Sequence, residues 1–486
     1  MAKQFTKQQL TKKSDDLSKW YTEVVQQAGL AEYAPVKGCI IIRPYAYAIW
    51  ERVQEVFNKW IKQDGVENAY FPLFIPHALL EKEKEHVQGF SPELAVVTIG
   101  GGEELAEPLV VRPTSETIMY DTFSKWISSW RDLPFKINQW CNIVRWEKRT
   151  FPFLRTMEFL WQEGHTVHAN EEDTVEMVKK ALEWYRRVYE ELFAVPVIAG
   201  IKSAAERFAG GKDTYTVEAL MPDGKALQGG TSHNLGQNFA KAFGILYQDA
   251  DGKTQIPWQT SWGLSTRSLG GLFLVHGDDN GLILPPKVAP IIVAIYPIFG
   301  KDDEKVRSFA QKLKEMIDAK SDAFPGKVVI YDDPEKSFGW RVNEGELRGI
   351  PLAIPVGLKE VESNTVTVRY RSGGLENEVV SLEENVSENI EKLLVKLQQH
   401  LLNKAKIFQE EHTYTVDSYD EFKKIMSTSR GFIKAFWCEN PICEAKIKEE
   451  TKATTRVKSF DEKKEEGTCL YCGNSASYRW YFAQAY

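Results

Sequence analysis

Two segments of alternating polarity in the first half of the chain, residues 137–147 and 157–165, are separated by a short basic loop. Two such runs joined by a loop of this length predict an antiparallel β-hairpin. Because side chains alternate between the faces of a strand, Arg145 and Glu147 are expected on the same face. The returning strand carries four side chains on one face: Phe159, Trp161, Glu163 and His165. The hairpin is therefore expected to place several charged and aromatic side chains together on a sheet.

Charged and aromatic side chains are mixed on this hairpin, and Arg155 follows in its loop. Unpaired buried charge is costly in free energy, so charges on a dry sheet need partners. A solvated sheet face with surface ion pairs would explain the charges alone. The aromatic side chains among them favour a ligand pocket.

The length of 486 residues suggests roughly three domains at about 150 residues each. Near Pro285 and Pro286 the pattern changes to alternating strands and helices, which is typical of an α/β domain with a mixed or parallel sheet. A long helix at 386–411 is expected to lead into a last unit. We therefore predict an α+β and α/β multidomain chain, divided into residues 1–284, 285–400 and 401–486.

Periodic apolar residues predict several helices in the first domain. The expected helices lie at 17–28, 45–61, 171–193 and 266–275, and strands are expected at 69–74, 216–221 and 256–262. In the second domain, helices are expected at 301–320 and 338–347, between strands at 291–296, 328–331, 350–355 and 366–370.

Bulk composition sets wide limits on function. The chain has 61 Lys and Arg against 68 Asp and Glu, a formal charge of −7, and its pI is about 5.8. This balance neither indicates nor excludes nucleic-acid binding, which needs only a local basic surface. The most apolar run, 288–299, is short and is interrupted by Pro290 and Pro297. Neither a secretory signal nor a membrane span is expected, so we predict a cytoplasmic protein without membrane contact.

Four of the six cysteines form two pairs near the C-terminus, in the pattern C-x4-C, 25 residues, C-x2-C. The four residues are Cys438, Cys443, Cys469 and Cys472. Four thiolates suit tetrahedral zinc, and a full set of protein ligands indicates a structural rather than a catalytic ion. The alternative is four unrelated buried thiols, which the regular spacing disfavours.

Three further polar segments carry groups suited to a ligand. Residues 112–117 (RPTSET) contain a carboxylate, although their hydroxyls could simply cap a following helix. Residues 227–233 (LQGGTSH) contain paired glycines, which let a ligand approach the backbone, although a plain turn has the same composition. Residues 261–267 (SWGLSTR) open a helix, and Arg267 in its first turn opposes the helix dipole. That placement suggests contact with an anion.

Together these segments resemble class II aminoacyl-tRNA synthetases. Prolyl-tRNA synthetases of the archaeal and eukaryotic type are similar in VRPTSET, in VRWE followed by FLRTMEFLWQEGHT, in LQGGTSHNLGQNF and in SWGLSTRSLGGL. The resemblance spans nearly the whole chain. It implies an antiparallel-sheet catalytic domain, an α/β anticodon-binding domain and a small α+β zinc-binding domain at the C-terminus.

The resemblance implies where ATP binds. Arg145 is expected to meet the α-phosphate and the amino-acid carboxylate, and Arg267 the γ-phosphate, so these two are the expected catalytic residues. Phe159 is expected to stack on adenine. The other implied ATP-binding residues are Glu147, Arg155, Thr156, Gln228 and Thr231. ATP is thus the implied cosubstrate, together with Mg²⁺.

For proline, the resemblance implies that Thr114 and Glu116 bind the secondary ammonium group. The other implied proline-binding residues are Arg145, Trp161, Glu163, His165, His233, Ser261 and Gly263. The implied reaction is attack of the proline carboxylate on the α-phosphate, followed by transfer of the prolyl group to the terminal ribose of tRNA(Pro). A small aromatic pocket rejects residues of similar size only weakly, so activation of alanine or cysteine is expected. About 95 residues separate His165 from Ser261, too few for the large editing insertion of bacterial-type relatives.

The resemblance also implies a homodimer, formed through the helix and strand at 49–72. Anticodon contacts are expected from a charged cluster at a helix–strand junction, which consists of Arg341, Glu344, Glu346 and Arg348. A solvated helix end would explain the same charges nearly as well. A basic stretch in the last domain is a candidate phosphate contact: Lys446, Lys448, Lys452, Arg456 and Lys458. The carboxylate of Tyr486 is expected to fold back toward the active site.

Two other classes of function compete with this interpretation. A synthetase-like RNA-binding subunit without catalysis could lose its ATP-binding arginines, but Arg145, Arg155 and Arg267 are all present. A zinc-stabilised interaction module would leave the first 280 residues unexplained. We therefore favour the enzyme.

Overall fold

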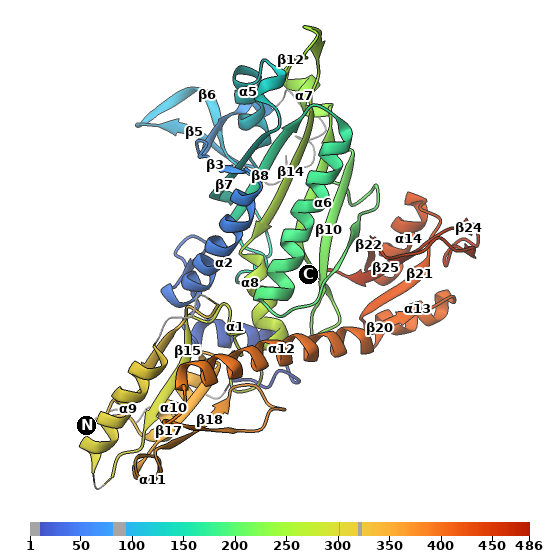
Figure 1. The fold of residues 1–486 in the computed structure, drawn as a ribbon. Coiled ribbons are helices and arrows are strands. Elements are labelled where there is room, and N and C mark those ends of the chain that lie inside the picture. The colour runs from blue at the N-terminus through green and yellow to red at the C-terminus, as the bar shows by residue number, and fades with distance from the viewer. Residues whose placement is uncertain (1–9, 81–93, 301, 319–322) are drawn as a thin grey trace.

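The computed structural model describes residues 10–80, 94–300, 302–318 and 323–486. Three regions follow one another along the chain, and helix α12 (Val386–Glu411) runs from the second region to the third (Figure 1). The expected bounds of this helix, 386–411, are confirmed.

A sheet of eleven strands forms the centre of the first region and continues into the third. Its order is β20-β21-β25-β22-β9-β10-β11-β14-β8-β7-β3, and only the pairs at its two ends are parallel. The strands from the first region are β3 (Glu67–Asn68), β7 (Phe135–Val144), β8 (Glu158–His168), β9 (Ile198–Ile201), β10 (Asp213–Leu220), β11 (Ala226–Gly236) and β14 (Trp258–Ser265). The expected hairpin is confirmed as β7 and β8.

Helix α6 (Glu171–Arg187) and the π-helical turn η3 (Val188–Leu192) pack on one face of this sheet (Figure 1). Three acidic residues begin α6 and two arginines end it, in the sense that the helix dipole favours. Tyr189 and Tyr185 press against the paired glycines of β11: a Cβ on Gly229 would come within 2.7 Å of the Tyr189 ring, and one on Gly230 within 2.8 Å of Tyr185. These glycines are therefore required for close packing of α6, whereas the sequence suggested only ligand approach or a turn.

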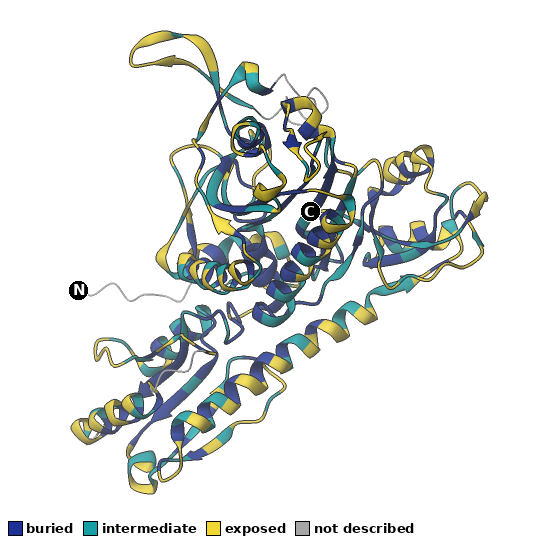
Figure 2. Ribbon diagram, turned by 45° about the horizontal axis from the view of Figure 1, so that its top comes forward, coloured by how far each residue is buried: buried dark blue, intermediate teal, exposed yellow. Residues whose placement is uncertain are grey.

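Smaller elements surround the sheet. The helices are α1 (Leu17–Gln27), α2 (Pro44–Gln63), α3 (His77–Leu80), α5 (Glu116–Trp126), η2 (Trp130–Asp132), α7 (Asn238–Phe243) and α8 (Arg267–His276). The strands are β1 (Ala31–Tyr33), β2 (Ile40–Ile42), β4 (Phe74–Pro76), β5 (Ala95–Gly100), β6 (Glu103–Val111), β12 (Tyr247–Gln248) and β13 (Thr254–Gln255). The β5–β6 hairpin projects from the body and is mostly exposed (Figure 2).

The second region is an α/β unit with strand order β16-β15-β17-β18-β19. β16, β15 and β17 are parallel, and β18 and β19 are antiparallel to their neighbours, so the expected mixed sheet is confirmed. Its strands are β15 (Ile291–Pro297), β16 (Lys327–Ile330), β17 (Leu352–Val356), β18 (Thr365–Tyr370) and β19 (Glu378–Ser381). Its helices are α9 (Asp303–Ile317), α10 (Phe338–Leu347) and α11 (Leu358–Ser363). The ends of the helix expected at 301–320 lie partly outside the described residues.

The third region is joined to the first through the backbone. β22 pairs with β9, with Lys458 opposite Ile201 and Ser459 opposite Gly200. Its strands are β20 (Thr413–Thr415), β21 (Phe432–Phe436), β22 (Ala453–Ser459), β23 (Gly467–Thr468), β24 (Ser475–Ala476) and β25 (Arg479–Gln484). Its helices are α13 (Tyr419–Ser427) and α14 (Pro441–Thr451). The third region thus extends the sheet that carries the candidate site.

One expected strand is wrong. Residues 69–74 were predicted to be extended, but only short strands occur there, β3 before this segment and β4 from Phe74 onward. The segment is held by other contacts, since Ala69 donates its backbone N–H to Asn138 O at 2.8 Å and Phe71 donates to Gln139 Oε1 at 2.5 Å. Alternating apolar residues cannot distinguish such a side-chain-anchored segment from a ladder strand.

Candidate active site

A cavity of about 210 Å³ lies over the eleven-stranded sheet. Three neighbouring strands, β8, β14 and β11, supply its floor. Most of the expected site residues line it: Thr114, Glu116, Arg145, Phe159, Trp161, Glu163, His165, Gln228, Thr231, His233, Ser261, Gly263 and Arg267. Residues from four segments far apart in the sequence therefore meet in one place.

Strand register explains this convergence. Ser261 of β14 lies opposite His165 of β8 and also opposite His233 of β11. Directly opposed residues share a face of the sheet, so these three side chains form one row across it. Two residues along β14, Gly263 forms a second row with Glu163 and Thr231.

Glu163 is a buried carboxylate at the centre of a hydrogen-bond network. Its Oε1 accepts from Gln139 Nε2 at 2.8 Å and from Ser115 Oγ at 2.5 Å, and its Oε2 lies 3.3 Å from His165 Nε2. Burial alone raises the pKa of this carboxyl, but the hydrogen bonds from His165, Ser115 and Gln139 hold the pKa below its ordinary value. Glu163 is therefore an anion that fixes its neighbours.

The same network orients the other polar side chains of the row. His165 Nδ1 lies 3.0 Å from the hydroxyl of Tyr120, and the indole of Trp161 donates to Cys141 Sγ at 3.2 Å. Cys141 in turn lies 3.4 Å from Glu163 Oε1, and burial is the main cause that raises its pKa, followed by the charge of Glu163. Cys141 is thus a neutral support behind the cavity.

Two arginines border the cavity from different elements. Arg145 follows β7, donates from Nε to Pro113 O at 3.2 Å, and lies 5.6 Å from the centre of the Phe159 ring. Arg267 begins α8 and donates from Nε to Leu154 O at 2.9 Å. Burial lowers the pKa of Arg267, although arginine remains charged at neutral pH. Each of these two cations donates a hydrogen bond to a backbone carbonyl at the border of the cavity.

The loop of residues 112–117 is anchored by Arg112, which is fully buried. Its guanidinium donates to Asn142 O at 2.9 Å, to Phe71 O at 2.7 Å and to Asn142 Oδ1 at 3.0 Å. Thr114 Oγ1 donates to the Glu116 carboxylate inside the cavity wall. Ser115 occupies the cap position of α5, but its hydroxyl bonds to Glu163 and does not cap the helix. The alternative of simple helix capping is therefore wrong for Ser115.

Three expected ATP-site residues do not line the cavity. Glu147 and Arg155 lie in the loop between β7 and β8 and pair with each other at 2.7 Å. Thr156 donates from Oγ1 to Glu158 O at 2.7 Å. The structure places all three in the hairpin loop, beside the cavity rather than in its wall.

Part of the cavity wall is formed by residues that the sequence motifs did not predict. These residues are Lys202, Glu206, Arg207, Phe208 and Thr214, together with Trp262 and Ser265. Most follow the short strand β9, which carries no period-two pattern. The sequence feature that could have indicated this part of the wall is the dense run of polar residues directly after a short apolar segment.

The four paired cysteines come together in the third region. Their sulfur atoms all lie within 4.8 Å of one another, and Cys438 Sγ lies 3.7 Å from both Cys443 Sγ and Cys472 Sγ. Four sulfurs around one zinc at ~2.3 Å are separated by ~3.8 Å, so the spacing fits a tetrahedral ion. A hydrogen bond from the backbone of Asn474 is the main cause that lowers the pKa of Cys472 to about 7, whereas burial is the main cause that raises the pKa of Cys438 and of Cys443.

The second-region cluster is solvated only in part. Arg341 is buried and donates to Tyr331 O at 2.5 Å, and its guanidinium lies 5.0 Å from the Phe299 ring centre. Arg348 pairs with Glu344 at 2.8 Å and lies 5.7 Å from the Tyr45 ring centre. These side chains pack against neighbours, so the solvated alternative is wrong for Arg341.

The basic stretch of the third region is not a uniform cationic surface. Arg456 is 5 % exposed and is paired with Glu218, so it is not placed to meet phosphate from solvent. Lys446, Lys448 and Lys458 have acidic partners in Glu449, Glu206 and Glu439. Sequence spacing alone could not show that these acids lie beside them.

The C-terminal residue, Tyr486, lies beside Ala226, the first residue of β11. Its backbone N–H donates to Ala226 O at 3.1 Å, and its ring is covered by the Lys225 ammonium at 4.8 Å. Ala226 precedes Gln228 by two residues along β11. The end of the chain therefore contacts the start of β11, the strand that carries Gln228 of the cavity wall.

Comparisons with known proteins agree with this geometry. Residues 98–275 match the class II core domain of the G, H, P, S and T tRNA synthetases, and residues 292–393 match an anticodon binding domain. Residues 419–486 match the C-terminal domain of prolyl-tRNA synthetase. The proline–tRNA ligase of Alkaliphilus oremlandii is 48% identical over 484 residues, which cover 100% of this chain and 99% of that protein. This chain belongs to the prolyl-tRNA synthetases.

Other relatives in this family are similar over their full length. The proline–tRNA ligase of Natranaerobius thermophilus is 48% identical over 481 residues, covering 98% of both chains. A crystal structure of prolyl-tRNA synthetase from Cryptosporidium parvum, complexed with halofuginone and AMPPNP, has 42% sequence identity. It superposes with a TM-score of 0.93 and covers 98% of this chain and 99% of that one. The resemblance found in the motifs therefore extends to the whole chain.

Within the described residues, no helix is both long enough and apolar enough to cross a membrane.

Proposed function

We propose that the cavity on β8, β11 and β14 is where this prolyl-tRNA synthetase binds ATP and proline together. The family activity, ATP-dependent activation of proline followed by charging of tRNA in translation, is the activity of this chain. The observation that carries the site is the convergence of Arg145, Arg267, Glu163 and His165 on one cavity. The structure from Cryptosporidium parvum is complexed with AMPPNP, which supports nucleotide binding by this chain.

In this site Arg145 neutralises the α-phosphate and the proline carboxylate, and Arg267 neutralises the far end of the triphosphate. Both guanidinium groups are preorganised by carbonyl contacts, so little reorganisation is needed when charge develops. The proline carboxylate attacks the α-phosphate and pyrophosphate leaves, which requires no protein nucleophile. Phe159 provides an aromatic face for adenine, and the other ATP-site residues are Gln228, Thr231, Glu147, Arg155 and Thr156.

The proline ring occupies the end bounded by the two cross-strand rows. Thr114 and Glu116 receive its secondary ammonium, and Trp161 faces Gly263, where a Cβ would approach the Trp161 ring to 3.3 Å. A glycine at this position therefore leaves room beside the aromatic wall. Glu163, His165, His233 and Ser261 complete the enclosure.

The cysteine cluster supports a structural zinc, held by Cys438, Cys443, Cys469 and Cys472. Its sulfur spacing fits the ion, and four cysteine ligands leave no position for substrate. Enzymes of this class use ATP with Mg²⁺. The Mg²⁺ would accompany the triphosphate into the cavity.

The second region supports tRNA binding, because it matches the anticodon binding domain. Residues 1–284, 285–400 and 401–486 remain our proposed division into catalytic, anticodon-binding and zinc-binding domains. Transfer of proline to tRNA(Pro) places the enzyme at the site of translation, in the cytoplasm.

A homodimer through residues 49–72 is supported by an exposed aromatic side chain at the sheet edge. β3 is the last strand of the eleven-stranded sheet, and Tyr70, directly beyond it, is 71% exposed. Sheet edges with exposed aromatic residues are suited to pairing with a second copy.

The decisive experiment is ATP–pyrophosphate exchange with each of the twenty amino acids. We expect proline to give the highest kcat/KM. If exchange is absent with proline, or faster with another amino acid, the proposed site is wrong. Light scattering of the same preparation tests the dimer, which a monomer mass at assay concentration would contradict.

A further inference from the structure

One wall of the cavity is formed by the segment 202–208, which follows β9. Phe208 stacks on the imidazole of His233 with ring centres 4.4 Å apart. The backbone N–H of Phe208 donates to Thr214 Oγ1 at 2.9 Å, and this hydroxyl lies 2.9 Å from His233 Nδ1. The position of this wall therefore sets the position of His233 in the cavity.

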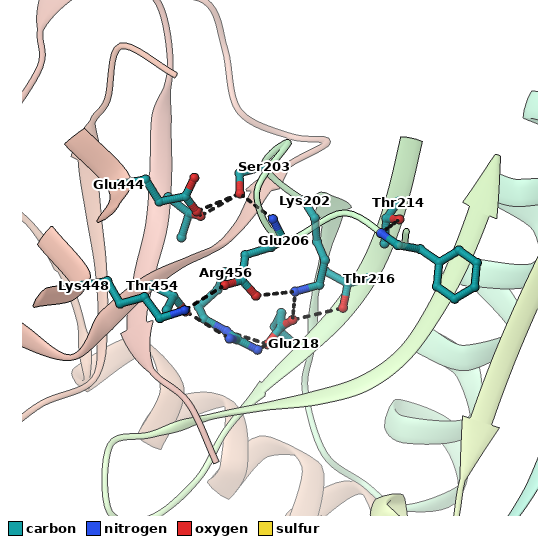
Figure 3. Close-up of polar contacts among 12 residues, drawn as sticks. Lys202, Ser203, Glu206, Thr214, Thr216, Glu218, Glu444, Lys448, Thr454 and Arg456 are labelled. Atoms are coloured by element: carbon teal, nitrogen blue, oxygen red, sulfur yellow. Dashed lines mark hydrogen bonds and ion pairs between the residues drawn. The ribbon is translucent and has the colours of Figure 1, made fainter. Parts of the chain in front are cut away.

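The segment is tied to the third region through a buried carboxylate, Glu218 (Figure 3). Arg456 of β22 donates to Glu218 Oε2 from Nη2 at 2.8 Å and from Nε at 3.1 Å. On the other oxygen, Lys202 Nζ lies 3.6 Å from Oε1, and Thr216 Oγ1 donates to Oε1 at 3.0 Å. Glu218 is fully buried, and the Lys202 and Arg456 side chains are 3% and 6% exposed. One carboxylate thus joins a cation of the cavity wall to a cation of the third region.

Helix α14 makes a second tie to the same segment (Figure 3). Glu444 accepts a hydrogen bond from Ser203 Oγ at 2.7 Å and another from Thr455 Oγ1. Lys448 lies 3.8 Å from the Glu206 carboxylate, whose other oxygen lies 3.9 Å from Lys202. The third region therefore contacts the segment directly at Ser203 and Glu206, and it reaches Lys202 through Glu218.

We propose that Arg456 and Glu444 are positioning residues for the proline end of the cavity, acting through Glu218, Lys202 and Ser203. This inference rests on the proposed function, because it takes the His233 side of the cavity as the proline site. A buried carboxylate keeps its hydrogen bonds or forces its surroundings to move. Loss of Arg456 leaves Glu218 to Lys202 and Thr216, which draws Lys202 toward the carboxylate and displaces the wall that carries Phe208.

The test is Arg456→Met in proline-dependent pyrophosphate exchange with the full-length enzyme. The KM for proline is expected to rise about tenfold, because a small displacement of a positioning wall weakens binding substantially. The KM for ATP is expected to stay within about twofold, because the ATP-site arginines have separate anchors. Arg456→Lys restores the charge but not the two-point contact, so it is expected to recover part of the proline KM.

Arg479→Met is the matched control. Arg479 is an arginine of the same region, its side chain is 13% exposed, and it pairs with Asp417 at 2.9 Å and Glu465 at 3.3 Å. Both partners belong to the third region. This variant is expected to lower the melting temperature without changing the proline KM. An equal rise in proline KM for both variants would show a general effect of the third region and overturn the proposal.

Ser203→Ala provides a second variant that buries no unpaired charge. It removes the hydrogen bond to Glu444 and is expected to raise the proline KM about threefold. It decides the question where Arg456→Met does not fold. If Arg456→Met folds and its proline KM is unchanged, the inference is overturned and the proposed function stands. If Arg456→Met is unfolded, an unchanged proline KM in Ser203→Ala has the same consequence. Absence of exchange in the unaltered enzyme would instead overturn the proposed function.

Discussion

The cavity and the cysteine cluster both gather polar groups that are costly to bury, but they arrange them differently. In the cavity, side chains from β8, β11, β14 and the loop 112–117 face a space of about 210 Å³. In the cluster, four sulfur atoms face one another within 4.8 Å. The first arrangement leaves room for a ligand that exchanges, and the second leaves room only for an ion.

This difference separates what each site contributes. Charges in the cavity are held by their own neighbours, as Glu163 is by Gln139, Ser115 and His165, so the empty fold can tolerate them. The four thiols have weaker support, mainly sulfur–sulfur contacts and the backbone hydrogen bond to Cys472, so four thiolates would need a bound ion. We therefore expect changes in the cavity to alter activity more than stability, and changes in the cluster to alter stability first.

Zinc removal is expected to have the largest effect. Metal binding supplies roughly 10–16 kcal/mol in small zinc-binding peptides, and this energy is lost from the folded state when the ion is removed. A chelator, or Cys469→Ser, should unfold the third region in a separate transition, followed by circular dichroism and by zinc analysis of the purified protein. Cys39→Ser, outside the cluster, should leave that transition unchanged. A protein without zinc and with unaltered melting would support four unrelated thiols.

Arg145→Ala tests the other side of the comparison. Removal of one preorganised charge from a transition state lowers the rate about 10²–10³-fold, equivalent to about 2.7–4 kcal/mol. We expect a loss of this size in kcat/KM for pyrophosphate exchange, with a melting temperature close to that of the unaltered enzyme. Arg131→Ala, at an arginine that lies over Trp130, is the control and should retain exchange. If Arg145→Ala melts early and keeps its activity, Arg145 is structural.

The same two regions show what can be predicted from sequence. Each cysteine pair is local, since Cys438 and Cys443 flank the start of α14 and Cys469 and Cys472 lie in one short turn, and spacing alone predicted which residues meet. The hairpin was equally local, because alternation fixed the face on which Trp161 and Glu163 lie. In both cases the geometry is set within a few residues of the motif.

The missed part of the site depends on contacts between distant segments. Lys202 and Arg456 are 254 positions apart, and both reach Glu218 because β22 pairs with β9. No local pattern at either residue encodes that pairing. For the same reason the sequence presented Arg456 as a member of a basic surface, whereas tertiary structure makes it a buried ion-pair partner. The motif resemblance predicted the residues that face the cavity, but it did not predict the residues that hold them in place.

Amino-acid selectivity tests the size and shape of the proline end of the cavity. We expect alanine and cysteine to be activated with kcat/KM about 10–200-fold below that of proline, because small apolar differences supply little discrimination. Gly263→Ala should reduce proline activation more than alanine activation, since its Cβ would come within 3.3 Å of the Trp161 ring. Pyrophosphate exchange with the three amino acids measures both effects. No measurable exchange with cysteine would contradict the expected weak discrimination.

The smallest expected effect concerns acid stability and tests whether the cavity network compensates Glu163. The folded-state pKa of Glu163 is held below its ordinary value, so the carboxylate contributes stability at neutral pH. This contribution is fully present above the unfolded pKa and is lost as the pH falls through the depressed folded pKa. We expect Glu163→Gln to be about 1–3 kcal/mol less stable at pH 7. The difference should shrink below about pH 5, as the carboxyl becomes protonated in both states.

Urea unfolding of both proteins between pH 7 and pH 4 measures this difference, with Glu176→Gln as the control because Glu176 is 74% exposed. A pH-independent difference would mean that Glu163 contributes shape and hydrogen bonds but no net charge stabilisation. The cavity would then resemble the cysteine cluster, in that its charge would need a bound partner to be tolerated. A difference that shrinks with acid shows instead that the protein alone supports the charge, so that the site is organised before proline or ATP arrives.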